Sequence, residues 1–326
     1  MVPQVSVLIP VFNRKGYIAE CIQSALDQTY SDFEVVIVDN ASDDGTWEIC
    51  QEYAERDSRI RIFRNERNIG PVRNWLACVE QAAGRYTKIL WSDDLIHPRF
   101  LEVLLPYLDD PSVGFVYSSA KLFSDEKVNF EEDYASVDAA TNERVYESNV
   151  YISGILLDGG LEHGLYPVSP GCAIFRTKDV KKNLLLQVPN RVESDFSMHA
   201  IGNDLLLFLL TANEYGNIVL VNQVLSYFRV HSDSITVAST LGKIPLHYSL
   251  AKGFFAERYL TDRSLLKKFN SVLLIQLIRY RAASFGIKSL RDFYPTNNLV
   301  EIDLGYFIHI VIHRTYLKIH RIFGGN

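Results

Sequence analysis

Several features that are common in chains of this size are scarce or missing from these 326 residues. The four cysteines, Cys21, Cys50, Cys78 and Cys172, include no pair with the spacing of a metal-binding or redox motif. We therefore expect buried thiols and a reducing, cytoplasmic environment. No run of about 18 or more apolar residues is present, so no membrane-spanning helix is expected. The N-terminal stretch lacks a basic leader and a cleavage site, which is typical of a first strand rather than a signal peptide.

Glycine-rich phosphate loops are absent as well. The chain contains neither a GxGxxG nor a GxxxxGK(S/T) pattern. These patterns hold phosphates in dinucleotide dehydrogenases and P-loop enzymes, so their absence argues against both classes. If a nucleotide binds to this chain, its phosphates need a metal ion in place of a glycine cradle.

Positive charge is scarce in most of the chain and concentrated at one end. Residues 241–326 hold 13 Lys and Arg against 5 Asp and Glu, a net charge of +8, and the first 240 residues hold 20 against 34, a net charge of −14. The two values add to the overall −6. The acidic body argues against nucleic acid as the main ligand, and the basic tail indicates a different partner.

Strand-like and helix-like patterns alternate through the first part of the chain. Continuous apolar or β-branched runs predict strands at 5–12, 33–39, 60–63, 86–91 and 113–123. Apolar residues at helical spacing predict helices at 17–28, 46–57, 73–84 and 99–110. This alternation predicts an α/β fold with a mostly parallel sheet flanked by helices.

The later part of the chain is less regular. Residues 124–149 are acidic and predict a loop or lid, 203–213 predict a helix, and the pattern from 244 onwards is helical. We therefore divide the chain into a body at 1–240, with halves 1–123 and 124–240, and a basic helical region at 241–326.

Polar residues directly follow three of the predicted strands. Residues 12–14, 39–44 and 92–94 come after separate strands. Because ligands of such sheets bind at the carboxyl ends of the strands, we expect these segments to meet in one site.

Adjacent carboxylates end the strand at 86–91. One of Asp93 and Asp94 could cap the helix that follows Pro98, but capping does not explain two of them. A divalent cation such as Mg²⁺ or Mn²⁺ takes oxygen ligands and would remove the repulsion between the two charges. Asp39 ends another strand, where a carboxylate could accept hydrogen bonds from a base or ribose.

Five segments together resemble the family 2 glycosyltransferases, which have the GT-A fold. They are VSVLIPVFNR, VIVDNASDDGT, NIGPVRNWL, GRYTKILWSDD and LSYFRVHSDSIT, in the order and spacing of that family. The resemblance is dense over 5–99, thinner over 171–236, and fades after about 240. It implies inverting, Mg²⁺- or Mn²⁺-dependent transfer from a nucleotide sugar, with UDP the favoured nucleotide, to a hydroxyl.

The resemblance also implies roles for single residues. Those that would bind the nucleotide sugar are Pro10, Phe12, Asn13, Asp39, Arg73, Asp93 and Arg229. Asp94 would be the main metal ligand, with Asp93 and His231 as further candidates. The family's acidic triplet reads Ser-Asp-Asp here, which leaves Asp93 between ribose and metal.

Inverting transfer also needs a carboxylate base. By matching position this is Asp204, preceded by Asn203 where the family often has an acid. The alternatives are that Asp204 only caps or charges the start of its helix, or that Glu193 or Asp195 takes the role.

The basic tail has two interpretations. Its helices either pack on the body or on another subunit, or they lie on an anionic membrane at the cytoplasmic face. The second fits a glycan or lipid-linked acceptor in bacterial surface polysaccharide synthesis, a setting that rests on the resemblance. The alternatives to a glycosyltransferase are a non-catalytic carbohydrate-binding or scaffold protein and a sugar-phosphate nucleotidyltransferase, although the segment PVFNRKG matches the glycine-rich loop of the latter poorly.

Overall fold

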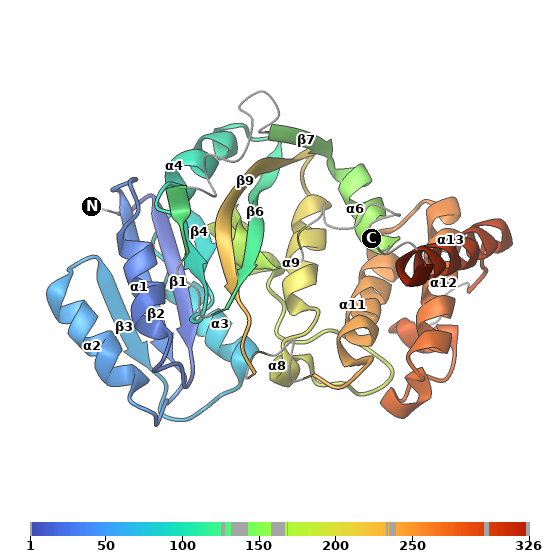
Figure 1. Cartoon of the computed structure of the whole chain (residues 1–326), viewed down its shortest axis with the longest axis horizontal. Coiled ribbons are helices and arrows are strands. Elements are labelled where there is room, and N and C mark those ends of the chain that lie inside the picture. Colours follow the sequence, from blue (N-terminus) through green and yellow to red (C-terminus); the bar gives the residue numbers. More distant parts are fainter. Residues whose placement is uncertain are drawn as a thin grey trace. The chain divides into compact units, whose positions relative to one another are not determined.

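A computed structural model gives the fold of this chain. It describes residues 2–124, 128–131, 143–157, 167, 169–232, 234, 239–296 and 300–323. Over this part of the chain, nine strands form one mixed sheet with helices on both faces (Figure 1), as the alternating pattern predicts.

The sheet has the strand order β3-β2-β1-β4-β8-β6-β9-β5, and β7 pairs with β9. The strands are β1 Val5–Val11, β2 Phe33–Asp39, β3 Ile60–Arg64, β4 Tyr86–Ile89, β5 Leu95–Ile96, β6 Val113–Phe123, β7 Glu143–Glu147, β8 Ala173–Arg176 and β9 Asn217–Arg229. The first four run parallel to one another, and β8 is antiparallel to its neighbours β4 and β6. The predicted parallel core is therefore confirmed for the first four strands.

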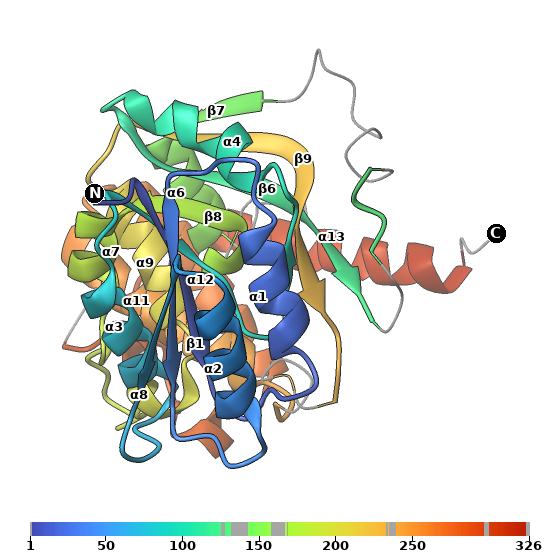
Figure 2. The same cartoon turned by 90° about the vertical axis from the view of Figure 1, so that its left-hand side faces the viewer.

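The central strands are covered on both faces. Every residue of β1 and of β2 is buried, which explains why their sequences are mostly apolar instead of alternating. Figure 2 shows α1 Ile18–Leu26 and α2 Thr46–Arg56 on one side of β1, and α3 Pro71–Gln81 on the other. The remaining helices around the sheet are α4 Phe100–Leu104, α6 Ser148–Leu156, α7 Thr177–Asn183, α8 Phe196–His199 and α9 Asn203–Ala212, with 3₁₀ turns η1 Leu105–Asp109 and η3 Pro170–Cys172.

The cysteines pack inside these layers. All four are free and buried, as expected. Burial raises the pKa of the Cys50 thiol to about 12 and that of Cys172 to about 12, so these thiols stay protonated at neutral pH.

Three predicted elements differ from the observed ones. The strand predicted at 86–91 ends at Ile89, and the helix predicted at 99–110 changes to a 3₁₀ turn at Leu105, where Pro106 removes a backbone donor. The loop predicted at 124–149 contains β7, which pairs antiparallel with β9. The neighbouring β9 stabilises β7, and a sequence pattern does not reveal such a partner. Residues 125–127 and 132–142 of that loop lie outside the described residues.

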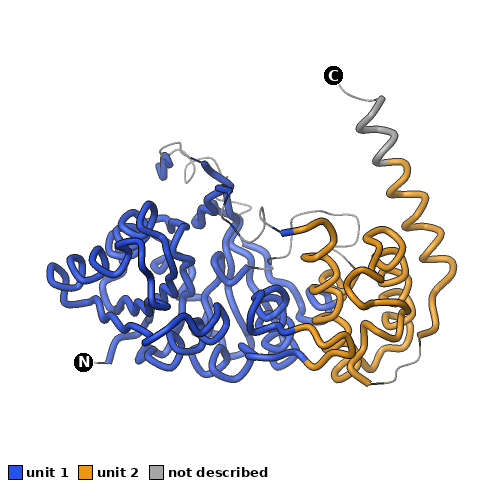
Figure 3. Tube along the Cα trace, turned by 90° about the horizontal axis from the view of Figure 1, so that it is seen from below, with its two compact units in different colours: residues 1–152, 166–188, 195–239 blue, residues 153–165, 189–194, 240–326 orange. Residues whose placement is uncertain are grey.

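The chain forms two compact units (Figure 3). The first contains residues 1–152, 166–188 and 195–239, and the second contains 153–165, 189–194 and 240–326. The second unit is built from α11 Lys243–Tyr259, α12 Arg263–Arg279, α13 Leu304–Phe323 and the 3₁₀ turns η4 Ala282–Phe285 and η5 Leu290–Phe293. At Gly253 a Cβ atom would lie 2.0 Å from the Phe293 carbonyl oxygen, so α11 and η5 pack this closely only with glycine there. None of the described helices is both long and apolar enough to cross a bilayer.

Candidate functional site

The candidate site lies at the edge of the sheet where β1 and β4 end. In the strand order β1 lies between β2 and β4. The chain therefore adds β2 and β3 on one side of β1 and then crosses over to place β4 on the other side. Such a reversal leaves a crevice outside the carboxyl ends of the strands. The loops after β1, β2 and β4 reach the same edge because these strands are parallel.

The loop after β1 is bonded to the loop after β2. Asn13 Nδ2 donates to Asp43 Oδ1 at 2.9 Å, Asn13 Oδ1 accepts from Asp43 N at 3.1 Å, and Asn13 N donates to Ser42 Oγ at 2.8 Å. Asn13 has φ +49°, a left-handed conformation that asparagine tolerates better than most residues. Pro10 is buried within β1, whereas Phe12 is 39% exposed. Phe12 is therefore the exposed aromatic ring of this loop.

Asp39 is enclosed by its own protein neighbours. Its side chain is 0% exposed, Arg64 Nε lies 3.1 Å from Asp39 Oδ2, and Ser42 N donates to the same oxygen at 3.1 Å. Asp39 thus holds the turn after β2 in place. The structure does not bring its carboxylate to the surface, where the resemblance implies a base or ribose contact.

Arg64, at the end of β3, is a residue that sequence reasoning missed. Its guanidinium pairs with Asp39, donates to the Ser42 carbonyl at 2.7 Å, and lies 5.3 Å from the centroid of the Trp47 ring. The side chain remains 40% exposed. The available signal in the sequence was the position of this basic residue at the end of a parallel strand.

Asp93 is in contact with one histidine and two arginines. His231 Nε2 lies 2.8 Å from Asp93 Oδ2, and Arg14 Nε lies 3.4 Å from the same oxygen. The Asp93 carbonyl accepts from Arg229 Nε at 3.0 Å. These contacts join the ends of β1, β4 and β9, and they engage Asp93 with the protein.

The surroundings of Asp94 differ from those of Asp93. Asp94 is 6% exposed, and its Oδ1 accepts from Arg229 N at 2.9 Å. Within the part of the chain that the structure describes, no hydrogen bond reaches Asp94 Oδ2. Burial, and next the charge of Asp93, raise the pKa of Asp94 well above its usual value. A bound cation would compensate this buried charge.

Arg229 and His231 hold the acidic loop. The Arg229 side chain is 7% exposed, donates to Glu20 Oε2, and lies 4.5 Å from the centroid of the Phe123 ring. His231 Nδ1 is buried without a hydrogen-bond partner in the described structure. Arg229 is committed to protein contacts, whereas His231 keeps one ring nitrogen for a further partner.

Asp204 stands in the first turn of α9. Its Oδ1 accepts from Gly202 N at 2.9 Å and from Leu205 N at 2.8 Å. Its neighbour Asn203 is 0% exposed and donates to the Leu185 carbonyl at 2.7 Å. Asn203 therefore serves packing, and Asp204 is the acid that this turn presents.

The rivals of Asp204 are placed differently. Asp195 caps α8, and its hydrogen bonds from Ser197 and then from Gln187 lower its pKa. Glu193 is exposed and belongs to the second unit.

Arg73 lies on α3. Its guanidinium donates to Ser197 Oγ at 2.9 Å, which ties α3 to α8. Among the described residues the hydrogen-bond partner of Arg73 is Ser197, and no hydrogen bond among them joins Arg73 to the Asp93–Asp94 loop.

A buried lysine lies beneath the acidic loop, and sequence reasoning did not identify it. Lys88 on β4 is 0% exposed, donates to the Gly171 carbonyl, and has its Nζ 4.2 Å from the centroid of the Phe100 ring. Burial lowers the pKa of Lys88 to about 7, and the negative charge of Asp94 partly opposes that shift. Gly171 in turn packs on Trp91 and Phe228, so Lys88 supports the turn beside the candidate site.

We expect Lys88 to make stability depend on pH. A lysine whose pKa is lowered by folding contributes stability at high pH, and that contribution is lost as the pH falls towards the folded pKa of about 7. The free energy of unfolding of the wild type should therefore rise by about 2 kcal/mol from pH 7 to pH 9 relative to Lys88→Met, at up to about 1.4 kcal/mol per pH unit. Urea denaturation at both pH values measures this, and parallel behaviour of the two proteins would contradict it.

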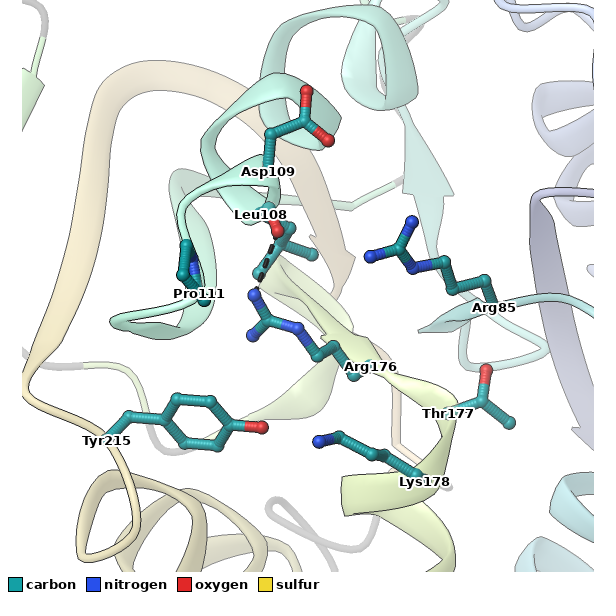
Figure 4. A pocket seen from close by; sticks show the side chains of 8 residues that line it. All are labelled: Arg85, Leu108, Asp109, Pro111, Arg176, Thr177, Lys178 and Tyr215. Atoms are coloured by element: carbon teal, nitrogen blue, oxygen red, sulfur yellow. Dashed lines mark hydrogen bonds between the residues drawn. The ribbon is translucent and has the colours of Figure 1, made fainter.

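A separate cavity of about 560 Å³ lies at the other edge of the sheet (Figure 4). It is lined by Arg85, Leu108, Asp109, Pro111, Arg176, Thr177, Lys178 and Tyr215. Arg85 directly precedes β4, whereas the acidic loop follows that strand. Arg176 donates to the carbonyls of Leu108, Asp110 and Val113 and so braces the wall of the cavity. This cavity is not part of the candidate site.

Comparison with known proteins agrees with this geometry. The model of the family described as "Glycosyl transferase family 2" matches residues 6–184. A putative teichuronic acid biosynthesis glycosyltransferase, TuaG of Bacillus subtilis, is 36% identical over 124 residues, which are 38% of this chain and 49% of that protein. Glycosyltransferase GlyG of Streptococcus pneumoniae is 29% identical over 126 residues, 39% of this chain and 42% of that protein. The matches thus span less than half the length of these relatives.

Solved structures share the fold. Staphylococcus aureus TarS 1–349 in complex with UDP-GlcNAc has a TM-score of 0.61 at 17% identity, covering 87% of this chain and 76% of that one. The mannosyltransferase PcManGT from Pyrobaculum calidifontis, in complex with GDP-Man and Mn²⁺, has a TM-score of 0.54 at 15% identity, covering 97% and 81%. These likenesses confirm the predicted GT-A-like fold. Because the family model covers more than half of its residues, the chain belongs to glycosyl transferase family 2.

Proposed function

We propose that this chain transfers a sugar from a nucleoside diphosphate sugar to a hydroxyl group of a glycan or lipid-linked saccharide, with inversion, in the synthesis of a bacterial surface polysaccharide. The observation that carries the proposal is Asp94, a buried acid at the reversal of the strand order whose Oδ2 has no hydrogen bond from any described residue. A UDP-sugar is the favoured donor, supported by the UDP and UDP-GlcNAc complexes of TarS. Relatives named for teichuronic acid biosynthesis and as a chondroitin synthase support the setting.

The donor set fits a Mg²⁺ or Mn²⁺ ion. Asp94 would hold it, with Asp93 and His231 Nδ1 as further candidates, and a bound ion would stabilise the charge that develops on the departing diphosphate. Within the described residues no three His, Cys, Asp or Glu side chains form a complete metal cluster. This agrees with a Mg²⁺-type site, in which substrate phosphates and water supply most of the ligands. The Mn²⁺ complex of PcManGT supports the same choice.

We assign Asp93 to holding the site together. Its contacts to His231 and Arg14 occupy the oxygen Oδ2, so Asp93 would hold these two side chains in place at this edge of the sheet. Asp93 is 17% exposed in its side chain, which leaves room for a ribose hydroxyl.

The nucleoside would lie against the loops after β1 and β2. Phe12 offers an exposed ring for stacking, and Asn13 shapes the loop beside it. Arg64 is half-exposed and pairs with the buried Asp39, so a bound base would contact the Arg64 side chain before that of Asp39. Arg73 would steady the donor through its position on α3.

Asp204 would act as the base. Its Oδ1 is fixed by two backbone amides, so the carboxylate is oriented before the acceptor arrives. The acceptor hydroxyl would lose its proton to Asp204 as its oxygen attacks the anomeric carbon, and the bond to the diphosphate would break on the opposite face.

The proposal predicts metal-dependent turnover of a nucleotide sugar. In the presence of Mn²⁺, we expect full-length protein to hydrolyse, or to transfer the sugar from, at least one donor in a panel of UDP- and GDP-sugars. EDTA should abolish that activity, because no glycine loop is available for the phosphates. Release of nucleoside diphosphate measures this. Thermal shift with each donor is the companion measurement, since a bound donor raises the apparent stability. Binding without turnover on every donor would favour a non-catalytic carbohydrate-binding protein.

A further inference from the structure

The last helix of the chain presents an apolar face to solvent. We propose that the outer face of α13, formed by Leu304, Ile308, Val311, Ile312 and Tyr316, docks on a membrane surface with anionic headgroups. This goes beyond the proposed transferase activity and does not depend on it.

The helix α13 is apolar on both of its faces. It packs on α12 through one of them, where Ile310 is 5% exposed and Phe307 is partly buried. The five residues of the outer face are 63%, 48%, 43%, 63% and 61% exposed, in chain order. Their spacing of four, seven, eight and twelve residues from Leu304 places them in one stripe along the helix. A contiguous apolar stripe of this length indicates an interaction surface.

The charge of the same segment selects the partner. From residue 304 to the end the sequence contains Arg314, Lys318 and Arg321 and no Asp or Glu. These three basic residues recur in the sequence at intervals of four and three. An exposed apolar stripe in a segment that has basic residues and no acid is typical of a helix that lies in the headgroup region of an anionic bilayer.

A second copy of the chain fits the face less well. Two α13 segments brought together through this stripe would bring six basic residues near one another, with no acid from these segments to offset them. Like charges of this kind repel, whereas an anionic headgroup layer supplies the opposite charge.

The structure also favours α13 over α12. In the middle of α12 the side chains of Phe269, Val272 and Leu273 are at most 2% exposed, whereas Ile278 near its end is 68% exposed. The sequence alone gives both helices a similar basic and apolar character, and the contiguous exposed apolar stripe described above lies on α13.

Vesicle co-sedimentation tests the proposal with full-length protein. We expect the protein to bind vesicles of phosphatidylcholine that contain about 30% phosphatidylglycerol. Binding to vesicles of phosphatidylcholine alone, or at high salt, should be much weaker. The variant Ile308→Asp/Ile312→Asp should lower the bound fraction at least about tenfold, because two charges then face the hydrocarbon boundary. The matched control is Leu122→Asp/Leu241→Asp, which alters two exposed leucines elsewhere, and it should bind as the wild type does.

Three outcomes would overturn the proposal. Wild-type protein that binds neither vesicle, or both equally, contradicts an anionic membrane surface. Equal binding by wild type and the Ile308→Asp/Ile312→Asp variant contradicts the assigned face. A dimer in sedimentation velocity that this variant dissociates, without vesicle binding, assigns the face to a second copy instead. Matching thermal melts of the variants exclude loss of folding as the cause.

Discussion

The variant Asp94→Asn is expected to lose about 10³-fold in turnover while its fold remains at least as stable as that of the wild type. A thousandfold loss corresponds to about 4 kcal/mol of transition-state stabilisation, which is the scale of metal-ion catalysis. The amide can still accept the hydrogen bond from Arg229 N, and it removes a negative charge that is buried beside Asp93.

The stability of Asp94→Asn has a defined pH dependence. Because folding raises the pKa of Asp94, the wild-type acid favours the folded state at low pH, and that contribution is lost as the pH rises through the folded value. At neutral pH, in buffer without metal, the variant should therefore melt no lower than the wild type. Addition of Mn²⁺ and a nucleotide should raise the melting temperature of the wild type more than that of the variant.

The control for this experiment is Asp109→Asn, an exposed aspartate that lines the separate cavity. It should keep wild-type turnover and the wild-type response to Mn²⁺. Unchanged turnover in Asp94→Asn would refute the assignment of Asp94 as the metal ligand.

The second large effect is expected at Asp204. The variant Asp204→Asn should lower transfer to the acceptor by about 10²- to 10⁴-fold, the range that general-base catalysis supplies, and should leave donor affinity unchanged. Asn keeps an oxygen for the Gly202 and Leu205 amides but cannot take a proton at neutral pH. Rates with an acceptor, together with donor titration by thermal shift, separate the two effects.

Asp195→Asn is the matched comparison for Asp204→Asn. Hydrogen bonds from Ser197 and Gln187 lower the pKa of Asp195, which makes it a weaker proton acceptor, and removing its charge should affect transfer far less. If Asp195→Asn abolishes transfer and Asp204→Asn does not, the two roles are exchanged.

Local patterns were sufficient to predict the edge at which the candidate site forms. The strands at 5–12 and 33–39 are mostly apolar because both faces of β1 and β2 are covered, and parallel strands bring the loops that follow them to one edge. Asn13 bonds to Asp43 and Arg14 pairs with Asp93, so the loops after β1, β2 and β4 meet there.

The partners within that edge were beyond sequence reasoning. The sequence predicts that Asp39 faces a ligand. In the structure its carboxylate is enclosed by Arg64 from β3 and by the Ser42 amide. The groups that contact the side chains of Asp93 and Asp94 belong to Arg14, His231 and Arg229, and these residues approach from distant strands. Lys88 looks like an ordinary polar residue of a strand, and its burial depends on the layers that cover β4.

The sequence by itself determined the layer architecture, the family and the edge of the sheet that carries the acidic pair, because hydrophobic periodicity and strand direction are local properties. Only the tertiary structure decided which side chains contact Asp93 and Asp94, which lysine is buried, and which tail helix exposes an apolar stripe. Those properties depend on side chains from separate elements meeting in space, and a linear pattern does not contain their pairing.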